Sequence, residues 1–141
     1  MCLLIDHGLR IGEVVALLAS DFDLDRGVLT FYRSKVDKTQ KHRLSKDTHA
    51  AAETFISSLE ADGRVFAVVD RTLRTRVGQL GAAVGLDHLS PHDCRHYWAT
   101  AATRNGTPIK ALQDAGGWAS PAMPLRYAES AEIANEGVKL E

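Results

Sequence analysis

One run in this sequence of 141 residues, VLTFYR at Val28–Arg33, is the clearest strand-type segment, because it consists mainly of β-branched and aromatic side chains. A weaker strand is expected around His42–Leu44. The polar stretch Ser34–Lys41 between them is expected to form a long hairpin loop that carries much of the positive charge. The segment before the first strand, Ser20–Gly27, is polar and rich in aspartate. The sequence therefore predicts one small antiparallel β-sheet or hairpin.

The rest of the chain has the apolar spacing of helices. Helices are expected at the first residues, over Ile11–Leu18, from Ser45 to about Gly63, over Thr72–Val84 and Pro91–Arg104, after Thr107-Pro108 and Ser120-Pro121, and in the tail from Ala128. In three places a Ser or Thr cap is followed by proline, which is typical of a helix start. The predicted fold class is α+β and mostly α-helical, with residues 1–141 as a single domain. Because no cap precedes the apolar opening Met1–Ile5, we expect a piece that lacks its first helices.

Composition excludes several classes of protein. No apolar run approaches the roughly 20 residues that span a bilayer, and the opening residues lack the features of a signal peptide. Two cysteines are too few for a disulfide framework, so a cytoplasmic location is expected. No His, Cys and acidic pattern predicts a metal site. Residues 33–76 hold ten basic and six acidic side chains within a nearly neutral chain, and this excess permits a local anionic partner.

Several polar residues lie where packing does not require them. His92 and Arg95 share a face near the N-terminus of the helix that begins at Pro91, a place that favours an anion. A turn is expected at Gly8, just before Arg10, and Glu13 is placed to orient the Arg10 guanidinium. Each residue also has an ordinary explanation, such as a surface ion pair or a capped helix end. Taken singly, none of them predicts a function.

Three segments, GLRIGEVVAL, SPHDCRHYWAT and GGWASPAMPLRY, resemble the catalytic blocks of the tyrosine recombinase or phage integrase family. The resemblance covers nearly the whole chain and has the motifs in family order. It implies the fold of the family's catalytic domain and the absence of the separate N-terminal domain of full enzymes. The catalytic residues that it implies are Arg10, Lys35, His92, Arg95, Trp118 and Tyr127, with Glu13 in support. Lys38 is the alternative to Lys35, because the loop is hard to align.

The activity that the resemblance implies is site-specific DNA recombination or integration, as in mobile genetic elements. Tyr127 would attack a DNA phosphate to give a 3′-phosphotyrosyl intermediate, without any cofactor or metal. Double-stranded DNA and further copies of the chain, in a tetrameric synapse, are the expected partners. Two alternatives stay open: a catalytically silent DNA-binding remnant of an integrase, and an enzyme of the type IB topoisomerase kind. The target DNA sequence cannot be read from these residues.

Overall fold

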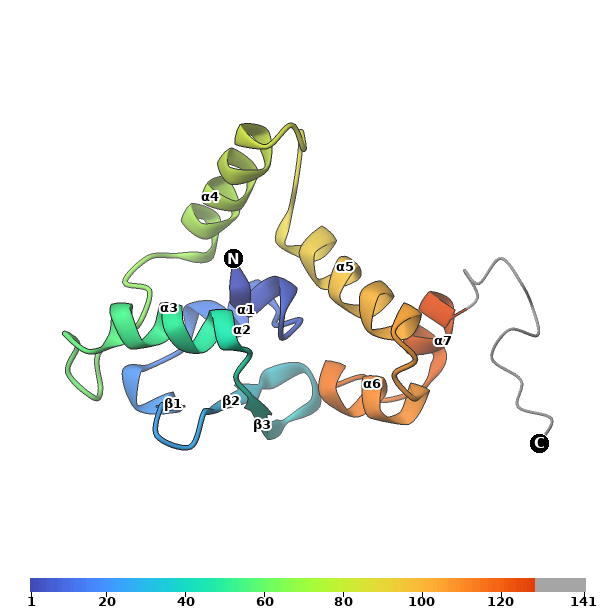
Figure 1. Ribbon diagram of the computed structural model, residues 1–141, viewed down its shortest axis with the longest axis horizontal. Coiled ribbons are helices and arrows are strands. Elements are labelled where there is room, and N and C mark those ends of the chain that lie inside the picture. The colour runs from blue at the N-terminus through green and yellow to red at the C-terminus, as the bar shows by residue number, and fades with distance from the viewer. Residues whose placement is uncertain (129–141) are drawn as a thin grey trace.

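The computed structural model describes residues 1–128, which form seven α-helices and a three-stranded sheet (Figure 1). In chain order the elements are α1 (Cys2–Ile5), α2 (Ile11–Val15), a 3₁₀ turn (Ala19–Asp21), β1 (Phe22–Asp23), β2 (Val28–Arg33), a second 3₁₀ turn (Ser34–Val36), β3 (Lys38–Arg43), α3 (Lys46–Ile56), α4 (Asp70–Ala83), α5 (Pro91–Arg104), α6 (Ile109–Gly116) and α7 (Ala122–Ala128). The predicted α+β, mostly helical class is confirmed. The expected helix in the tail lies outside the described residues, apart from Ala128 at the end of α7.

The sheet has the order β1-β2-β3 and is antiparallel throughout. The strand expected around His42–Leu44 is present, but it begins earlier than predicted, because β3 spans Lys38–Arg43 and pairs with β2 from Arg33 to Val28. The long loop expected over Ser34–Lys41 is instead a tight turn that ends at Asp37, whose φ of 46° is left-handed. The first residues of β3 carry no strand signal in the sequence, because β3 is a polar edge strand whose side chains are mostly exposed, so it lacks an apolar alternation.

The helix predicted over Ile11–Leu18 ends early, at Val15. The chain then turns so that Leu18 forms an isolated bridge with Arg64, and the backbone N–H of Leu18 donates to the Asp21 carboxylate at 2.8 Å. This turn leads directly into β1, a two-residue strand at Phe22–Asp23 that the polar segment did not predict. Leu17 and Leu18, which the prediction placed at the end of this helix, therefore lie in the turn that follows it.

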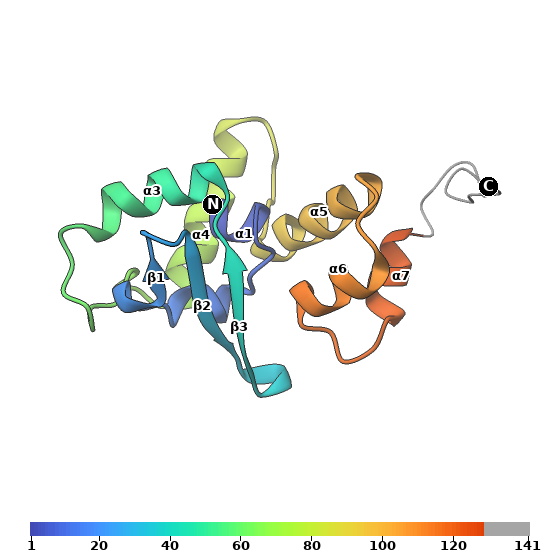
Figure 2. The same ribbon diagram turned by 60° about the horizontal axis from the view of Figure 1, so that its bottom comes forward.

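Two apolar clusters form the core. The larger packs α1, α2 and α3 around the sheet and includes Leu9, Leu17 and Leu29, none of them more than 1% exposed. The smaller lies among α5, α6 and α7 and contains Leu112 and Tyr127. These two groups of elements lie at opposite ends of the molecule in Figures 1 and 2, and α5 reaches from one to the other, with contacts to α1 as well as to α6 and α7.

Helix α4 extends away from the sheet (Figure 1). The apolar spacing over Thr72–Val84 predicts that Leu73, Val77, Leu80 and Val84 face inward and that Arg71, Arg74 and Arg76 face mostly outward. The arginines are exposed and Val77 is buried, but Leu80 and Val84 are 53% and 72% exposed, so the inward prediction was wrong for these two. Toward the C-terminal end of α4, the buried residue is Gly81, which packs against Leu89. Among residues 1–128, no helix is long and apolar enough to cross a membrane.

Candidate active site

A pocket of about 370 Å³ contains all six of the residues predicted to be catalytic. It lies where α2, the β2–β3 turn, α4, α5 and α7 meet, and so it draws on segments far apart in the sequence. Its lining consists of Arg10, Ile11, Lys35, Arg74, Pro91, His92, Arg95, Trp118, Met123 and Tyr127. Among residues 1–128, the lining contains four Lys or Arg side chains and one His but no carboxylate, so this lining suits an anion.

Arg95 forms the floor of this pocket. It is 6% exposed, and its Nη1 and Nη2 atoms donate to the carbonyl oxygens of Gly8 and Gly116, the latter at 2.6 Å. Burial, and next the positive charges of Arg10 and Arg33, lower the pKa of Arg95 from 12.5 to about 10. The Arg95 guanidinium remains a cation at neutral pH. Its Nε–H and the second N–H of each Nη can still donate to a ligand.

Arg10 lies on the α2 side of the pocket and is half-buried. Its Nη1 donates to Glu13 Oε1 at 3.1 Å, and its backbone N–H donates to Glu13 Oε2 at 2.7 Å. Glu13 thus caps α2 and orients the arginine that precedes the helix. The predicted supporting contact of Glu13 is present.

Three exposed basic side chains line the pocket, namely Lys35, His92 and Arg74, and Arg74 was not predicted to belong to the site. Lys35 stands in the short turn between β2 and β3 and lines the pocket, whereas Lys38, the alternative lysine, begins β3 and does not line it. His92 is the second residue of α5, directly after the proline that begins the helix. The Ser cap predicted before Pro91 is confirmed and forms a capping box, because Ser90 Oγ accepts from the Asp93 backbone N–H at 3.2 Å and Asp93 Oδ2 accepts from the Ser90 backbone N–H at 2.9 Å.

Tyr127 lies on α7, is 6% exposed and packs in an aromatic cluster with His96 of α5 and with Trp118. Its ring meets the His96 ring edge-on at 4.8 Å and lies 6.0 Å from Trp118. Trp118 is also the surface on which the Arg95 guanidinium rests, 4.6 Å from the ring centroid. Trp118 therefore connects the arginine and the tyrosine through direct packing.

Arg33 was not predicted to take part in the site, yet it is fully buried beside it. Its Nη1 lies 3.0 and 2.9 Å from the two oxygens of Glu13, and its Nη2 donates to the Ala115 carbonyl at 2.7 Å. Its Nε donates to Gln40 Oε1 at 2.5 Å. A signal was available in the sequence, since strand alternation puts Leu29, Phe31 and Arg33 on one face of β2, the buried one.

Two glycines leave room for these contacts. Gly8 has φ of 60° and its Cα faces the Trp98 ring, so a Cβ there would overlap the indole. Gly117 has φ of 64°, and a Cβ there would overlap Cδ of Arg33. Both positions require a left-handed backbone and the absence of a side chain.

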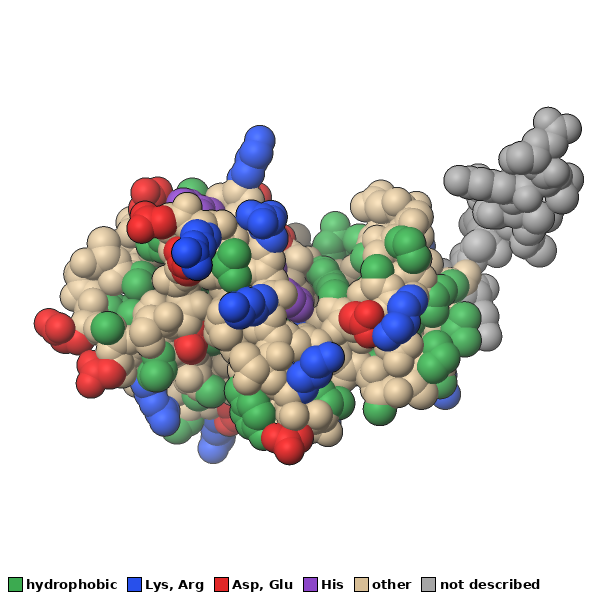
Figure 3. Space-filling model, turned by 90° about the horizontal axis from the view of Figure 1, so that it is seen from below, with side chains coloured by type: hydrophobic (Ala, Val, Ile, Leu, Met, Phe, Trp, Pro, Cys, Tyr) green, Lys and Arg blue, Asp and Glu red, His purple; other side chains and the backbone are tan. Residues whose placement is uncertain are grey.

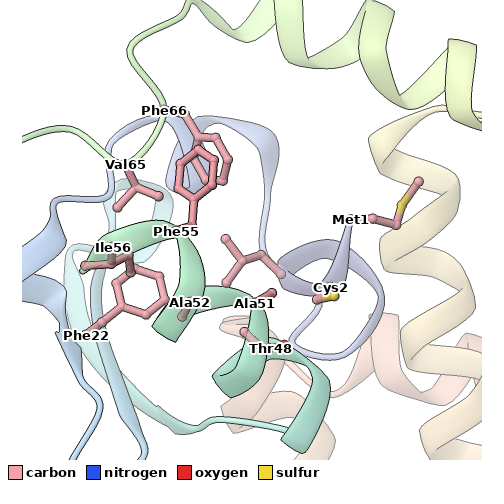
Figure 4. A pocket seen from close by; sticks show the side chains of 11 residues that line it. Met1, Cys2, Phe22, Thr48, Ala51, Ala52, Phe55, Ile56, Val65 and Phe66 are labelled. Carbon is pink, nitrogen blue, oxygen red and sulfur yellow. The ribbon is translucent and has the colours of Figure 1, made fainter. Parts of the chain in front are cut away.

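A second pocket, of about 200 Å³, lies between α1 and α3 and is almost wholly apolar (Figure 4). It is bordered by the rings of Phe55 and Phe66, whose centroids are 6.1 Å apart, and within residues 1–128 the Thr48 hydroxyl and the free thiol of Cys2 are the only polar or reactive side-chain groups in its lining. It contains no basic side chain that could bind a phosphate among these residues. Within residues 1–128, no three His, Cys, Asp or Glu side chains gather in a way that could hold a metal ion.

The sequence of the chain matches the model of the phage integrase family over residues 1–133. The chain belongs to the phage integrase family. Among curated proteins, this integrase-family chain is similar to tyrosine recombinase XerA of Saccharolobus solfataricus, with 30% identity over 111 residues that cover 79% of this chain and 38% of the relative.

Solved structures agree with this assignment. The integrase-family chain is similar to a crystal structure of XerA recombinase, with a TM-score of 0.81, 26% identity and coverage of 92% of this chain and 52% of that one. It shares the fold of XerH site-specific recombinase bound to difH substrate, with a TM-score of 0.74, 20% identity and coverage of 89% and 40%. The chain thus spans about half, or less, of the length of these relatives.

Proposed function

We propose that this chain is the catalytic part of a tyrosine recombinase, which cuts and rejoins DNA at specific sites through a 3′-phosphotyrosyl intermediate. The observation that carries the proposal is the pocket in which Arg10, Lys35, His92 and Arg95 lie with Tyr127, without a carboxylate from the part of the chain that the structure describes. Guanidinium groups match the nonbridging oxygens of a phosphodiester. The recombinase names of the relatives, and the substrate-bound state of one of them, support DNA as the partner.

In the proposed reaction, the phenolic oxygen of Tyr127 attacks the phosphorus, and the bond from phosphorus to the 5′ oxygen breaks. The phenolic proton passes to a base, for which His92 is the candidate, and the Lys35 ammonium gives a proton to the departing 5′ oxygen. Arg10 and Arg95 hold the nonbridging oxygens, and the indole N–H of Trp118 donates to the same phosphate. A 5′-hydroxyl from another strand reverses these steps and reseals the DNA.

On the face seen in Figure 3, Lys and Arg side chains are interspersed with Asp and Glu, so that face is not one positive surface. The pocket combines its positive charge with the nucleophile, which is why we place the cleaved phosphate there. Strand exchange between two duplexes requires several active sites, and we therefore expect a homo-oligomer, a tetrameric synapse, on DNA.

A nicked-substrate experiment tests the proposal. A pool of duplexes carries a nick with randomised sequence around it, so that cleavage near the nick releases a short fragment that cannot religate. The expected result is a covalent protein–DNA adduct on a denaturing gel, which Tyr127→Phe abolishes. Tyr97→Phe is the matched control, because Tyr97 is 62% exposed and lies outside the pocket lining.

The contrary outcomes are equally clear. An adduct that survives in Tyr127→Phe would contradict the role of that phenol. A chain that binds the pool but forms no adduct at any DNA concentration would be the silent DNA-binding remnant instead.

A further inference from the structure

Arg33 is the one Arg or Lys side chain in residues 1–128 that is completely buried, at 0% exposure. A buried guanidinium is costly unless its donors are paired. Burial lowers the pKa of Arg33, and the nearby Glu13 carboxylate opposes this shift. The side chain meets the cost with partners on three different elements: Glu13 on α2, Gln40 on β3 and Ala115 on α6. A residue placed in this way fixes those elements relative to one another.

On one side, the guanidinium of Arg33 lies at the C-terminus of α6, where it binds the Ala115 carbonyl. The last carbonyl groups of a helix have no partner within the helix and carry its negative partial charge. Three consecutive carbonyls here are bound by side chains from outside: Asp114 by Gln40 Nε2 at 2.6 Å, Ala115 by Arg33 and Gly116 by Arg95. The buried arginine and the pocket arginine thus occupy neighbouring places on the same helix end.

On the other side, Arg33 reaches the second pocket arginine through one carboxylate. Glu13 accepts from Arg33 Nη1 and also from Arg10 Nη1, so the two guanidinium groups share it. The connection closes into a ring, because Arg95 also binds the carbonyl of Gly8, two residues before Arg10. Arg33 further ends β2, two residues before Lys35 in the turn.

We infer that Arg33 is a positioning residue, which holds Arg10, Arg95 and the turn of Lys35 in one fixed arrangement around the phosphate without contacting it. The inference rests on the proposed cleavage activity. Small displacements of a catalytic group lower the rate of the chemical step, by up to about 10²-fold for 1 Å. A purely structural role would instead lower stability and leave the rate of the folded protein unchanged.

The test measures single-turnover adduct formation at saturating DNA, together with the Kd for DNA and the melting temperature. Two substitutions are compared. Arg33→Met removes the charge, and Arg33→Lys keeps a cation beside Glu13 but cannot reach Glu13, Gln40 and Ala115 together. Arg26→Met is the control, since Arg26 is an exposed arginine with an exposed ion pair to Asp23 at 3.8 Å.

We expect Arg33→Lys to slow cleavage by about tenfold or more while Kd changes by less than about threefold. We also expect part of the effect to pass through Arg10, so that Arg33→Lys slows the Arg10→Met variant by a smaller factor than it slows the unsubstituted chain. The control Arg26→Met should cleave at the rate of the unsubstituted chain. If Arg33→Met does not fold, Arg33→Lys decides the question.

Other results would overturn the inference. These are a folded Arg33→Lys that cleaves at the normal rate, a slowing that multiplies fully with that of Arg10→Met, or the failure of both variants to fold, which would assign Arg33 to stability alone. Failure of the proposed function looks different, because the unsubstituted chain would then form no adduct.

Discussion

Nη1 of Arg33 lies between the two carboxylate oxygens of Glu13, at 3.0 and 2.9 Å, and the two side chains are 0% and 7% exposed. The pair is therefore shielded from water, and its two charges compensate one another inside the protein. Removing one partner leaves the other charge buried and unpaired, which costs far more than the loss of a surface ion pair.

Glu13→Ala should lower the free energy of unfolding by about 3 kcal/mol or more, because Arg33 then stays buried without its counter-ion. Urea unfolding measures this change. Asp23→Ala is the matched control, since its pair with Arg26 is exposed, and it should cost less than about 1 kcal/mol. Equal losses in the two variants would show that the buried pair has no special weight.

Lys35→Met should slow cleavage of an ordinary phosphodiester by about 10²-fold or more, because the 5′ oxygen leaves poorly without a proton. A substrate with sulfur in the bridging 5′ position needs no such proton, since a thiolate is a good leaving group. Lys35→Met should cleave that substrate at nearly the normal rate. Lys38→Met serves as the comparison. If the sulfur substrate restored the cleavage rate of Lys38→Met and not that of Lys35→Met, Lys38 would be the acid.

The substitution Trp118→Phe removes the indole N–H but keeps an aromatic ring, so it separates the hydrogen-bonding role of Trp118 from its packing role. The phenyl ring can still lie under Arg95 and against Tyr127, so the free energy of unfolding should fall by less than about 1.5 kcal/mol. Cleavage should slow by about 10²-fold, as expected for the loss of one donor to the developing charge. The test compares the cleavage rate at saturating DNA with the free energy of unfolding measured in urea. A normal rate in a stable variant would limit Trp118 to packing.

Stability should decrease in mild acid because of His42. Burial, and next the charge of Arg33, lower the pKa of His42 from 6.5 to about 4 in the folded protein. Between pH 6.5 and about 4, the His42 side chain binds a proton more strongly in the unfolded chain than in the folded one. The contribution of neutral His42 to the free energy of unfolding is therefore complete above pH 6.5 and is lost as the pH falls toward 4. The loss should be at most about 3 kcal/mol, since His42 retains some exposure.

Urea unfolding at about pH 7.5 and about pH 5 checks this dependence. His42→Gln should weaken it, although His7, whose pKa is also lowered by burial, will keep part of it. His88→Asn is the control, because His88 is exposed and Asn accepts its φ of 62°. An unchanged pH dependence in His42→Gln would contradict the assignment.

The sequence was sufficient for the elements that carry strong local signals. The Ser90-Pro91 cap began α5 as predicted, and Gly117 ended α6 in a left-handed conformation. It was insufficient where tertiary contacts decide. Strand β3 exists because β2 pairs with it, not because of its own polar residues. Leu80 is exposed because, within residues 1–128, this end of α4 packs through Gly81 against Leu89 and not through Leu80.

The six predicted site residues lie around one pocket, so the motif spacing anticipated their arrangement in space. The supporting frame was less visible. Arg33 resembles the first basic residue of a charged hairpin, and only its alternation with Leu29 and Phe31 indicates burial. Its partner Ala115 is 82 residues away in the sequence and contributes a backbone carbonyl, which no side-chain motif can signal.

The most direct test of the account is the identity of the residue that carries DNA. The adduct formed with the nicked pool is digested with nuclease and protease, and the modified peptide is sequenced by mass spectrometry. The account predicts a nucleotide joined through its 3′-phosphate to Tyr127. A nucleotide on Tyr97, on Tyr32 or on a serine, or a linkage through a 5′-phosphate, would contradict it.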